Sequence, residues 1–255
     1  MMKNVLSQAD LDALYGTDYY SYAPPRGWLG VARKLKRRLI DRPFIPRFTR
    51  LLEVGCGWGE LLEVFKRRGD VTGLEISPAA AEYAAKKGIR IVCGHVEQLD
   101  TFPEKSFDYI YAYHSFEHWR DPNAGLRSCN RWLQKDGRLF LGIPNWDGLV
   151  ARIFRSSWYY IGPPLHVTNS TPRSMRLLLQ KHGFEIERIV YKSFPISIPA
   201  SFFIRFLGTD MHRIKKWERM MIMVLRLICY PINVLLDLLH LGDCMEVHAR
   251  KVRDC

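Results

Sequence analysis

The sequence predicts an α/β fold built on a doubly wound, Rossmann-like sheet of seven strands. From residue 50 onward, short apolar runs alternate with helical stretches, the pattern of parallel strands joined by crossover helices. Hydrophobic residues make up 47% of the 255 residues, which is enough for a packed core and too many for a disordered chain. The length favours one large domain with additions over two full domains.

Seven short apolar runs are the predicted strands. The first five cover residues 51–54, 71–75, 89–93, 107–113 and 138–143. A sixth at 184–191 and a seventh at 245–252 follow later in the chain. Because helical stretches separate the early strands, we expect those strands to be parallel.

The helices are predicted from the residues that start and stop them. Between the early strands they cover about 59–68, 78–87 and 122–134. Three dipeptides, Ser77-Pro78, Asp121-Pro122 and Thr171-Pro172, place a side-chain oxygen at the N-cap and proline at the first helical position. The helix that starts at Thr171-Pro172 is expected to end at Gly183.

Two segments lie outside this alternation, one before the first strand and one between the last two strands. They divide the chain into an N-terminal cap with a basic helix (1–48), a ligand-binding core (49–193), a helical amphipathic insertion (194–243) and the last core strand (244–255). The predicted architecture is therefore a seven-stranded sheet with an N-terminal helical cap and a helical insertion between strands six and seven.

The insertion contains 18 apolar residues among the 22 from Met220 to Leu241. The spacing of the four polar interruptions puts them on one stripe of a helix: Arg226, Asn233, Asp237 and His240. We therefore predict an amphipathic helix that is kinked near Pro231. Since no run of 18 unbroken apolar residues occurs, a simple membrane-spanning helix is not predicted.

The net charge of +12 comes from two segments. Residues 26–50 hold nine basic residues and one acidic residue, and residues 205–226 hold six basic and two acidic residues. A localised basic surface favours an anionic partner such as a phospholipid surface, a nucleic acid or a phosphorylated substrate. A solvated basic face without a partner is the alternative.

The six cysteines occur singly, without a CxxC pair: Cys56, Cys93, Cys129, Cys229, Cys244 and Cys255. This pattern is typical of reduced core thiols and argues against a zinc ribbon. The first thirty residues lack the apolar run of a signal peptide. We therefore expect a cytoplasmic protein.

The most informative stretch is LLEVGCGWGELL at 51–62. A buried strand ends at Glu53, and Gly55, Gly57 and Gly59 then form a tight turn into a helix, where an open α/β sheet binds its ligand. Two acidic residues near this turn suit a pyrophosphate poorly. Glu75, at the end of the next strand, is placed to accept both hydroxyls of a ribose.

With these motifs the sequence resembles the class I S-adenosylmethionine-dependent methyltransferases, especially the small-molecule group of ubiquinone-biosynthesis-like enzymes. The resemblance runs from about Leu51 to Ile143 and more loosely through 165–191. It includes CGHVEQLDTFPEKSFDYIYAYHSFEHWRDP, which is similar to the region of the third and fourth strands, and GRLFLGIPN, which is similar to the fifth strand. It implies a methyltransferase sheet with S-adenosylmethionine as cofactor.

The resemblance also implies the cofactor-binding residues: Glu53, Gly55, Cys56, Gly57, Gly59, Glu75, Ile76, His95, Val96, Glu97, Tyr113 and His114. The first five surround the methionine part, and Glu75 holds the ribose. Ile76, Val96 and Glu97 border the adenine, while the last two residues line the floor below the sulfonium. His95 replaces an aspartate that is common in the family, and a neutral imidazole can accept the same hydrogen bond from the adenine amine.

Candidate catalytic residues are histidines, because a hydroxyl acceptor must lose its proton during methyl transfer. His114 and His166 are the candidates, His166 because its proline-rich loop follows the fifth strand. His114 and His118 are four residues apart, but no third ligand is indicated, so no metal site is predicted and Glu117-His118 is expected to be structural. Two residues at the end of the fifth strand are candidates for acceptor contact: Asn145 and Trp146.

These observations predict an S-adenosylmethionine-dependent methyltransferase that acts on a small or lipid-linked acceptor, with O-methylation favoured. Two alternatives stay open: an RNA-directed methyltransferase and a non-catalytic, membrane-docking scaffold of the same fold. The predicted helix in GWLGVARKLKRRLI, with its apolar stripe bordered by cations, favours peripheral association with an anionic membrane at its inner face.

Overall fold

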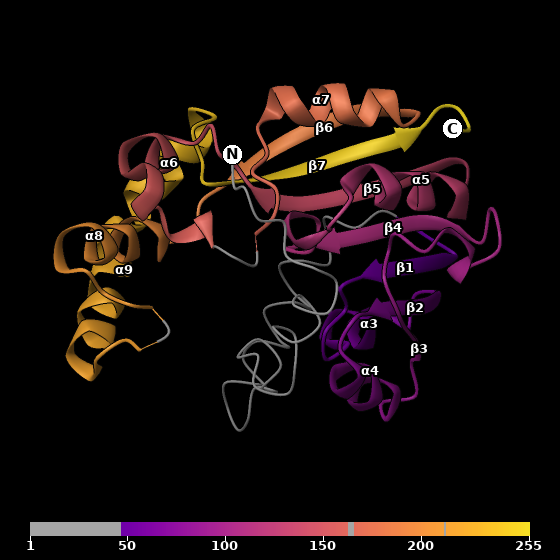
Figure 1. Cartoon of the computed structure of the whole chain (residues 1–255), viewed down its shortest axis with the longest axis horizontal. Helices are drawn as coiled ribbons and strands as arrows, with labels where there is room; N and C mark the ends of the chain where they lie inside the picture. The colour runs from indigo at the N-terminus through magenta and orange to yellow at the C-terminus, as the bar shows by residue number, and fades with distance from the viewer. Residues whose placement is uncertain (1–46, 163–165, 212) are drawn as a thin grey trace.

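The computed structural model describes residues 47–162, 166–211 and 213–255, and it shows a seven-stranded sheet flanked by helices (Figure 1). The strand order is β3-β2-β1-β4-β5-β7-β6, and β7 runs antiparallel to the other six strands. This confirms the predicted α/β fold class. The predicted N-terminal basic helix lies outside the described residues.

The seven strands lie where the sequence placed them, with small differences at their ends: β1 (Arg50–Val54), β2 (Asp70–Glu75), β3 (Arg90–Cys93), β4 (Phe107–Tyr113), β5 (Leu133–Pro144), β6 (Phe184–Lys192) and β7 (Cys244–Lys251). The largest difference is that β5 begins five residues earlier than predicted. Leu133 already pairs with Phe107, and a register shift follows before the regular ladder resumes at Tyr109. Long-range pairing of this kind leaves no local signal in the sequence.

The core helices are α3 (Glu60–Phe65), α4 (Pro78–Ala85), α5 (Pro122–Trp132) and α7 (Pro172–Lys181). Their N-caps behave as predicted: Ser77, Asp121 and Thr171 each accept backbone N–H groups of the following turn. Helix α3 ends three residues before the predicted end. A short helix, α6 (Leu149–Phe154), follows β5 and was not predicted.

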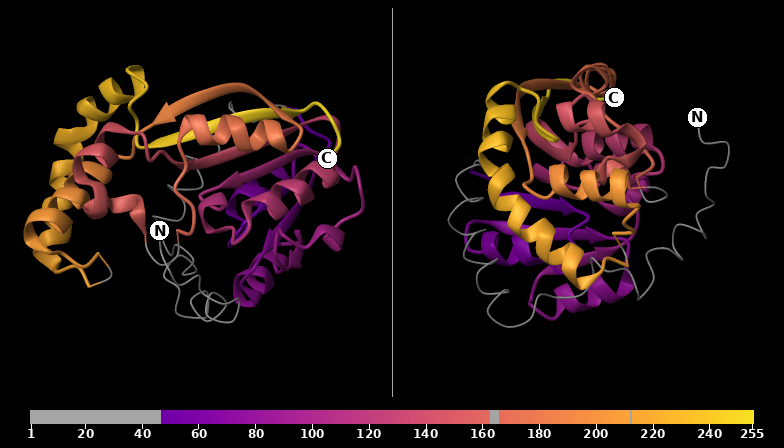
Figure 2. Two further views of the ribbon diagram at one scale, coloured as in Figure 1. Left: turned by 45° about the horizontal axis from the view of Figure 1, so that its top comes forward. Right: turned by 90° about the vertical axis from the view of Figure 1, so that its left-hand side faces the viewer.

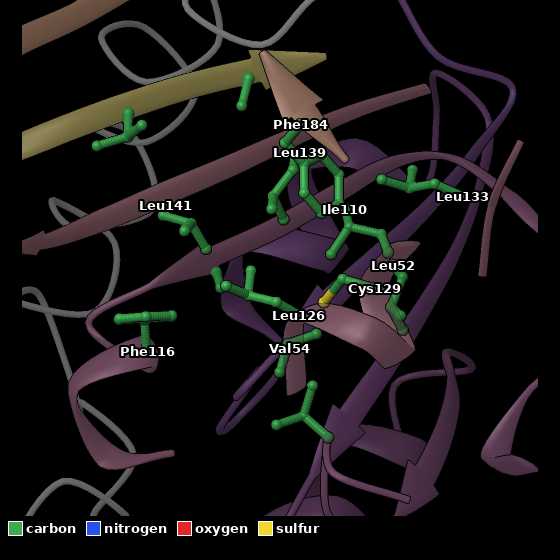
Figure 3. Close-up of a cluster of buried hydrophobic side chains, with 14 of the residues drawn as sticks. Leu52, Val54, Ile110, Phe116, Leu126, Cys129, Leu133, Leu139, Leu141 and Phe184 are labelled. Atoms are coloured by element: carbon green, nitrogen blue, oxygen red, sulfur yellow. The ribbon is translucent and has the colours of Figure 1, made fainter. Parts of the chain in front are cut away.

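The core lies on both faces of the sheet. On one face, α5 and α7 cover residues of the central strands, including Leu52, Ile110 and Leu141 (Figure 3). On the other face, α3 packs through Leu62 and Phe65 on the central strands. Because both faces of the parallel strands are buried, their carboxyl ends remain the natural place for a site.

Residues 194–243 contain two helices between β6 and β7, α8 (Ser197–Leu207) and α9 (Lys216–Leu238). They pack on each other beyond the carboxyl ends of the strands, at one end of the molecule (Figures 1 and 2). Helix α9 continues through Pro231. By length and composition alone, α9 could cross a membrane: an 18-residue window of the helix has a mean hydropathy of 1.8, and 17% of that window is buried.

Candidate functional site

The glycine loop after β1 adopts a backbone that requires glycine. Gly55, Gly57 and Gly59 all have positive φ angles, of 73°, 50° and 65°. A Cβ atom on Gly55 would lie 2.6 Å from the Oγ atom of Ser115, so this loop and the loop after β4 touch closely. A Cβ atom on Gly57 would meet nothing within 4 Å, which leaves room for a ligand against this backbone.

Glu75 is buried at the end of β2 and organises this loop. Its carboxylate accepts the backbone N–H of Gly57 at 2.7 Å and the N–H of Ser77 at 2.9 Å. Each carboxylate oxygen has a second lone pair and can accept a further hydrogen bond. The predicted role of Glu75 toward the two hydroxyls of a ribose is therefore compatible with its contacts.

The same end of the sheet is acidic, since Glu53 and Glu75 are both buried there. Burial raises the pKa of the Cys56 thiol, and the charges of Glu53 and Glu75 raise it further, so the thiol stays neutral. Two carboxylates beside an open glycine loop suit a ligand with cationic groups and a ribose diol. S-Adenosylmethionine has a sulfonium, an ammonium group and such a diol, so these two carboxylates fit it.

The residues predicted to border the adenine lie in the loops after β2 and β3. Ile76 directly follows β2, and Val96 is buried in the loop after β3. The backbone N–H of His95 donates to the side chain of Gln98. Glu97 lies in this loop, but its carboxylate accepts the backbone N–H groups of Arg120 and Asp121 at 2.9 and 3.4 Å. Glu97 thus ties together the loops after β3 and β4.

At the end of β4, His114 has an unusual backbone and a specific partner. Its φ angle is +50°, which is rare for a residue other than glycine and marks a position held by its surroundings. Its Nδ1 atom lies 3.1 Å from Oε1 of Glu117. Because a carboxylate oxygen only accepts, Nδ1 carries the proton and Nε2 is left as the basic nitrogen of the neutral ring.

Glu117 is a buried anion surrounded by imidazoles. Its side chain is completely enclosed, and burial by itself would raise the pKa of the carboxyl. The hydrogen bond from His114, together with the charges of His114, His118 and His166, outweighs burial and lowers the pKa. Glu117 is therefore ionised and can stabilise positive charge on His114.

Aromatic side chains enclose His114. The ring of Tyr113 lies edge-on at 4.8 Å, Tyr160 is stacked at 6.0 Å and Phe194 is tilted at 5.6 Å, measured between ring centroids. The sequence prediction included Tyr113 but missed Tyr160 and Phe194. Tyr160 comes from the 3₁₀ turn Tyr159–Ile161, and Phe194 follows β6. No local motif identifies these two residues, because only the packing of distant segments brings them together.

His166 reaches the same cluster from the loop after α6. Its Nδ1 atom lies 2.7 Å from the carbonyl oxygen of Tyr160, and its ring lies edge-on to His118 at 4.7 Å. The backbone N–H groups of Val167 and Thr168 donate to the carbonyl oxygen of Glu117. The structure therefore brings His166 next to Glu117 and His118, a third potential ligand that the sequence spacing did not indicate.

The two candidates for acceptor contact at the end of β5 both make contacts within the protein. Asn145 is buried, donates to the carbonyl oxygen of Gly242 and accepts the N–H of Asp147. Its amide thus holds the turn after β5 to the segment before β7. Trp146 packs in the small core around Trp158. These contacts give both side chains a structural role.

Comparison with known proteins supports this site. A family model described as "Methyltransferase domain" matches residues 52–141. A ubiquinone biosynthesis O-methyltransferase of Xanthomonas axonopodis is 28% identical over 146 residues, 54% of this chain and 61% of that protein. Its counterpart in Xanthomonas oryzae is 35% identical over 104 residues, 38% of this chain and 44% of that protein. The chain thus spans about half the length of the curated relatives it matches.

Solved structures show the same fold. A methyltransferase from Archaeoglobus fulgidus, described as dependent on S-adenosylmethionine, superposes with a TM-score of 0.57 at 21% identity, covering 88% of this chain and all of that one. Another from Thermotoga maritima gives a TM-score of 0.57 at 19% identity, covering 88% and 92% of the two chains. At this level of identity the likeness concerns the fold alone.

Proposed function

We propose that residues 52–141, which a methyltransferase-domain family model matches, form a class I S-adenosylmethionine-dependent methyltransferase domain and that the protein methylates an oxygen atom of a small or lipid-linked acceptor. One observation supports oxygen as the target atom. His114 lies at the cofactor end of the sheet, with its Nδ1 atom 3.1 Å from the buried carboxylate of Glu117. A phenol or alcohol needs such a base, because its oxygen must lose a proton.

The name of the relatives also supports oxygen as the methylated atom. Proteins called ubiquinone biosynthesis O-methyltransferase share this domain with the chain. The aromatic side chains of Tyr113, Tyr160 and Phe194 around His114 suit a planar acceptor ring. We therefore propose a ring hydroxyl as the preferred acceptor group.

The mechanism follows from these side chains. S-Adenosylmethionine supplies an electrophilic methyl group on its sulfonium. The aromatic side chains around His114 hold the acceptor ring in line with it, and such positioning provides a large part of the rate. The Nε2 atom of His114 takes the proton of the acceptor hydroxyl. Glu117 keeps Nδ1 protonated and stabilises the imidazolium that forms.

His166 is the second proposed catalytic residue, and its role has a direct test. We expect His166→Ala to leave the affinity for S-adenosylmethionine unchanged and to lower turnover roughly 100-fold, because one ring that faces the acceptor is lost. The measurement is transfer of a labelled methyl group to a panel of phenols, catechols and alcohols, with cofactor affinity from calorimetry. Unchanged turnover at every pH would make His166 a loop residue. No transfer to any hydroxyl by the wild type would contradict O-methylation.

A second part of the proposal concerns the membrane, and it is supported by the orientation of α9. Helix α9 buries five residues against the protein, and Glu218 and Asn233 among them are polar: Glu218, Ile222, Cys229, Asn233 and Leu236. The opposite side exposes large apolar side chains: Met220, Met223, Val224, Leu227, Ile228, Leu235 and Leu238. The helix thus buries two polar side chains and leaves most of its large apolar side chains exposed. This is the reverse of a helix that faces water.

The polar side chains of α9 are engaged with the domain. Glu218 accepts hydrogen bonds from the Thr209 hydroxyl and from the backbone N–H of Lys215. Asp237 accepts a hydrogen bond from the Ser193 hydroxyl at 2.7 Å. Because buried residues occur from Glu218 to Leu236, α9 lies along the domain over its length. This favours a helix in the plane of the membrane over a helix that crosses it.

Basic residues complete this surface. Six exposed cations lie on α8, on α9 and in the segment between them: Arg205, Arg213, Lys215, Lys216, Arg219 and Arg226. Exposed Phe202 and Phe206 on α8 extend the apolar area. Leucine, methionine and phenylalanine side chains bordered by cations suit an anionic lipid leaflet better than a nucleic acid. We propose that the protein is cytoplasmic and binds peripherally at the inner face of a membrane.

Replacement of two exposed side chains tests the membrane proposal. We expect Leu227→Glu with Ile228→Glu to reduce binding to vesicles of phosphatidylglycerol and phosphatidylcholine by roughly 100-fold or more, since each buried apolar side chain contributes about 1.5–3 kcal/mol. The measurement is co-sedimentation at low and high salt, with weaker binding expected at high salt. Leu177→Glu, at an equally exposed leucine on α7, is the matched control. Equal binding of both variants would contradict the proposal.

A further inference from the structure

Two acidic side chains meet where the C-terminal end of α9 is joined to β7. Asp237 lies in the last turn of α9, and Asp243 directly precedes β7. The hydroxyl of Ser193, just after β6, connects them: it donates to Oδ1 of Asp237 at 2.7 Å and accepts the backbone N–H of Asp243 at 3.4 Å. A Cβ atom on Gly242 would lie 2.5 Å from the same oxygen of Asp237, so the glycine allows this close approach.

The carboxyl group of Asp243 is buried in a place that suits its neutral form. The residue is 0% exposed, and neither carboxyl oxygen has a hydrogen-bond partner of normal geometry among the described residues. The nearby hydroxyl of Ser197 is also buried, and it accepts the indole N–H of Trp158 at 3.3 Å. A buried carboxylate with so little support is costly, whereas the protonated acid costs much less.

Burial and the second acid both favour a proton on Asp243. Burial is the main cause that raises the pKa of this carboxyl to about 7; the charge of Asp237 adds to the rise, and the Ser197 hydroxyl opposes it. Burial also raises the pKa of Asp237, against the hydrogen bond from Ser193 and the charge of Lys192. Two carboxylates that share a buried place disfavour each other's charge, so the pair is stable with a proton on Asp243.

The neighbouring elements offer little compensation for a negative charge on Asp243. The other ionisable groups near the pair are Lys192 of β6, Cys244 and Glu246 of β7, Tyr160 of the 3₁₀ turn and Glu117 after β4. The thiol and the phenol stay neutral, because burial raises the pKa of each well above its usual value. The lysine is already paired with the carboxylate of Glu246. An ionised Asp243 therefore meets mainly acidic or neutral groups.

The segment that carries Asp243 also ties α9 to the rest of the domain. The backbone N–H of Leu241 donates to the carbonyl oxygen of Leu236 in α9 at 2.8 Å. The carbonyl oxygens of Gly242 and Asp243 accept the side-chain and the backbone N–H of Asn145, just after β5. A charge on Asp243 thus acts at the point where the end of α9 is held against the turn after β5.

We propose that Asp237 and Asp243 form a pH-dependent latch, which holds the C-terminal end of α9 on the domain while Asp243 is protonated and loosens when Asp243 is ionised. Once this end opens, Asp243 meets water and has the ordinary pKa of an aspartate, near 4. Docking therefore takes up a proton between about pH 4 and pH 7. In this range each rise of one pH unit lowers the docking equilibrium about tenfold, and above it the equilibrium no longer changes.

Hydrogen exchange on the purified full chain tests the latch without membranes or methyl transfer, so the result is independent of the proposed function. Mass spectrometry follows the amides of residues 230–242 at pH 5.5 and pH 7.5. Asp243→Asn is an uncharged mimic of the protonated acid, and a comparison at equal pH cancels the intrinsic pH dependence of exchange. We expect the ratio of the wild-type rate to the variant rate to rise roughly 10- to 30-fold from pH 5.5 to pH 7.5. An unchanged ratio would overturn the proposal.

Further variants separate local opening from a damaged fold. Peptides from β4 should exchange equally in the wild type and in Asp243→Asn. Asp237→Asn removes the neighbouring charge, so the ratio of the wild-type rate to its rate should also rise with pH, by a smaller factor. Asp100→Asn, at an aspartate whose side chain is 88% exposed, is the matched control and should exchange like the wild type at both pH values. The same pH response in all three variants would also overturn the latch.

Discussion

Glu75→Ala is expected to reduce the affinity for S-adenosylmethionine by about 2–4 kcal/mol, the largest loss from one substitution in the cofactor site. The carboxylate is predicted to accept two ribose hydroxyls, and it accepts the N–H groups of Gly57 and Ser77. Its removal therefore leaves donors unpaired on the ligand and on the loop. Calorimetry with S-adenosylmethionine or S-adenosylhomocysteine measures the loss.

A second ligand separates the ribose contact from the support of the loop. A 2′-deoxy analogue of S-adenosylhomocysteine should bind the wild type more weakly than the parent compound, whereas Glu75→Ala should bind both equally. Glu82→Ala, which removes an exposed carboxylate on α4, is the matched control and should bind like the wild type. If Glu75→Ala still discriminates between the two ligands, the ribose assignment is wrong.

His114→Asn is expected to lower turnover roughly 10²- to 10⁴-fold while the affinity for the cofactor is retained, because the proposed base is removed. Asparagine is chosen because it tolerates the φ angle of +50° at this position. Single-turnover methyl transfer to the acceptor found in the hydroxyl panel measures the effect.

The chain offers a closely matched control for this substitution. His240 also has a positive φ angle, of 60°, and is exposed, so His240→Asn makes the same chemical change at the same kind of backbone position. It should retain wild-type turnover. Glu117→Gln should also lower turnover, because the charge that stabilises the imidazolium is lost. Wild-type turnover in His114→Asn would show that another group accepts the proton.

The sheet and the cofactor loop were predictable from the sequence because their signals are local. Apolar runs, N-cap residues followed by proline, and the glycines of the loop after β1 each act within a few residues of their own position. The same holds for Glu75, since the carboxyl ends of neighbouring parallel strands meet at one edge of the sheet.

The acceptor side depended on tertiary structure. His114, Tyr160 and Phe194 come from β4, a 3₁₀ turn and the segment after β6, and no spacing in the sequence relates them. The triad of Glu117, His118 and His166 escaped the sequence prediction for the same reason. Such contacts depend on loop conformations, which are set by long-range packing and backbone hydrogen bonds.

Helix α9 shows most clearly which features the sequence determined and which the tertiary structure decided. Its composition and the stripe formed by Arg226, Asn233, Asp237 and His240 were evident from the sequence, since helical periodicity is a local property. Which side of the helix would face the domain was not, because an amphipathic pattern is equally compatible with either face inward. The structure buries Asn233 and leaves Leu227 and Leu238 exposed. The structure also exposes Arg226 and His240, so only part of this stripe faces the domain. The sequence by itself thus determined that the helix has two faces, and only the packing against α8 and β6 decided which one is turned outward.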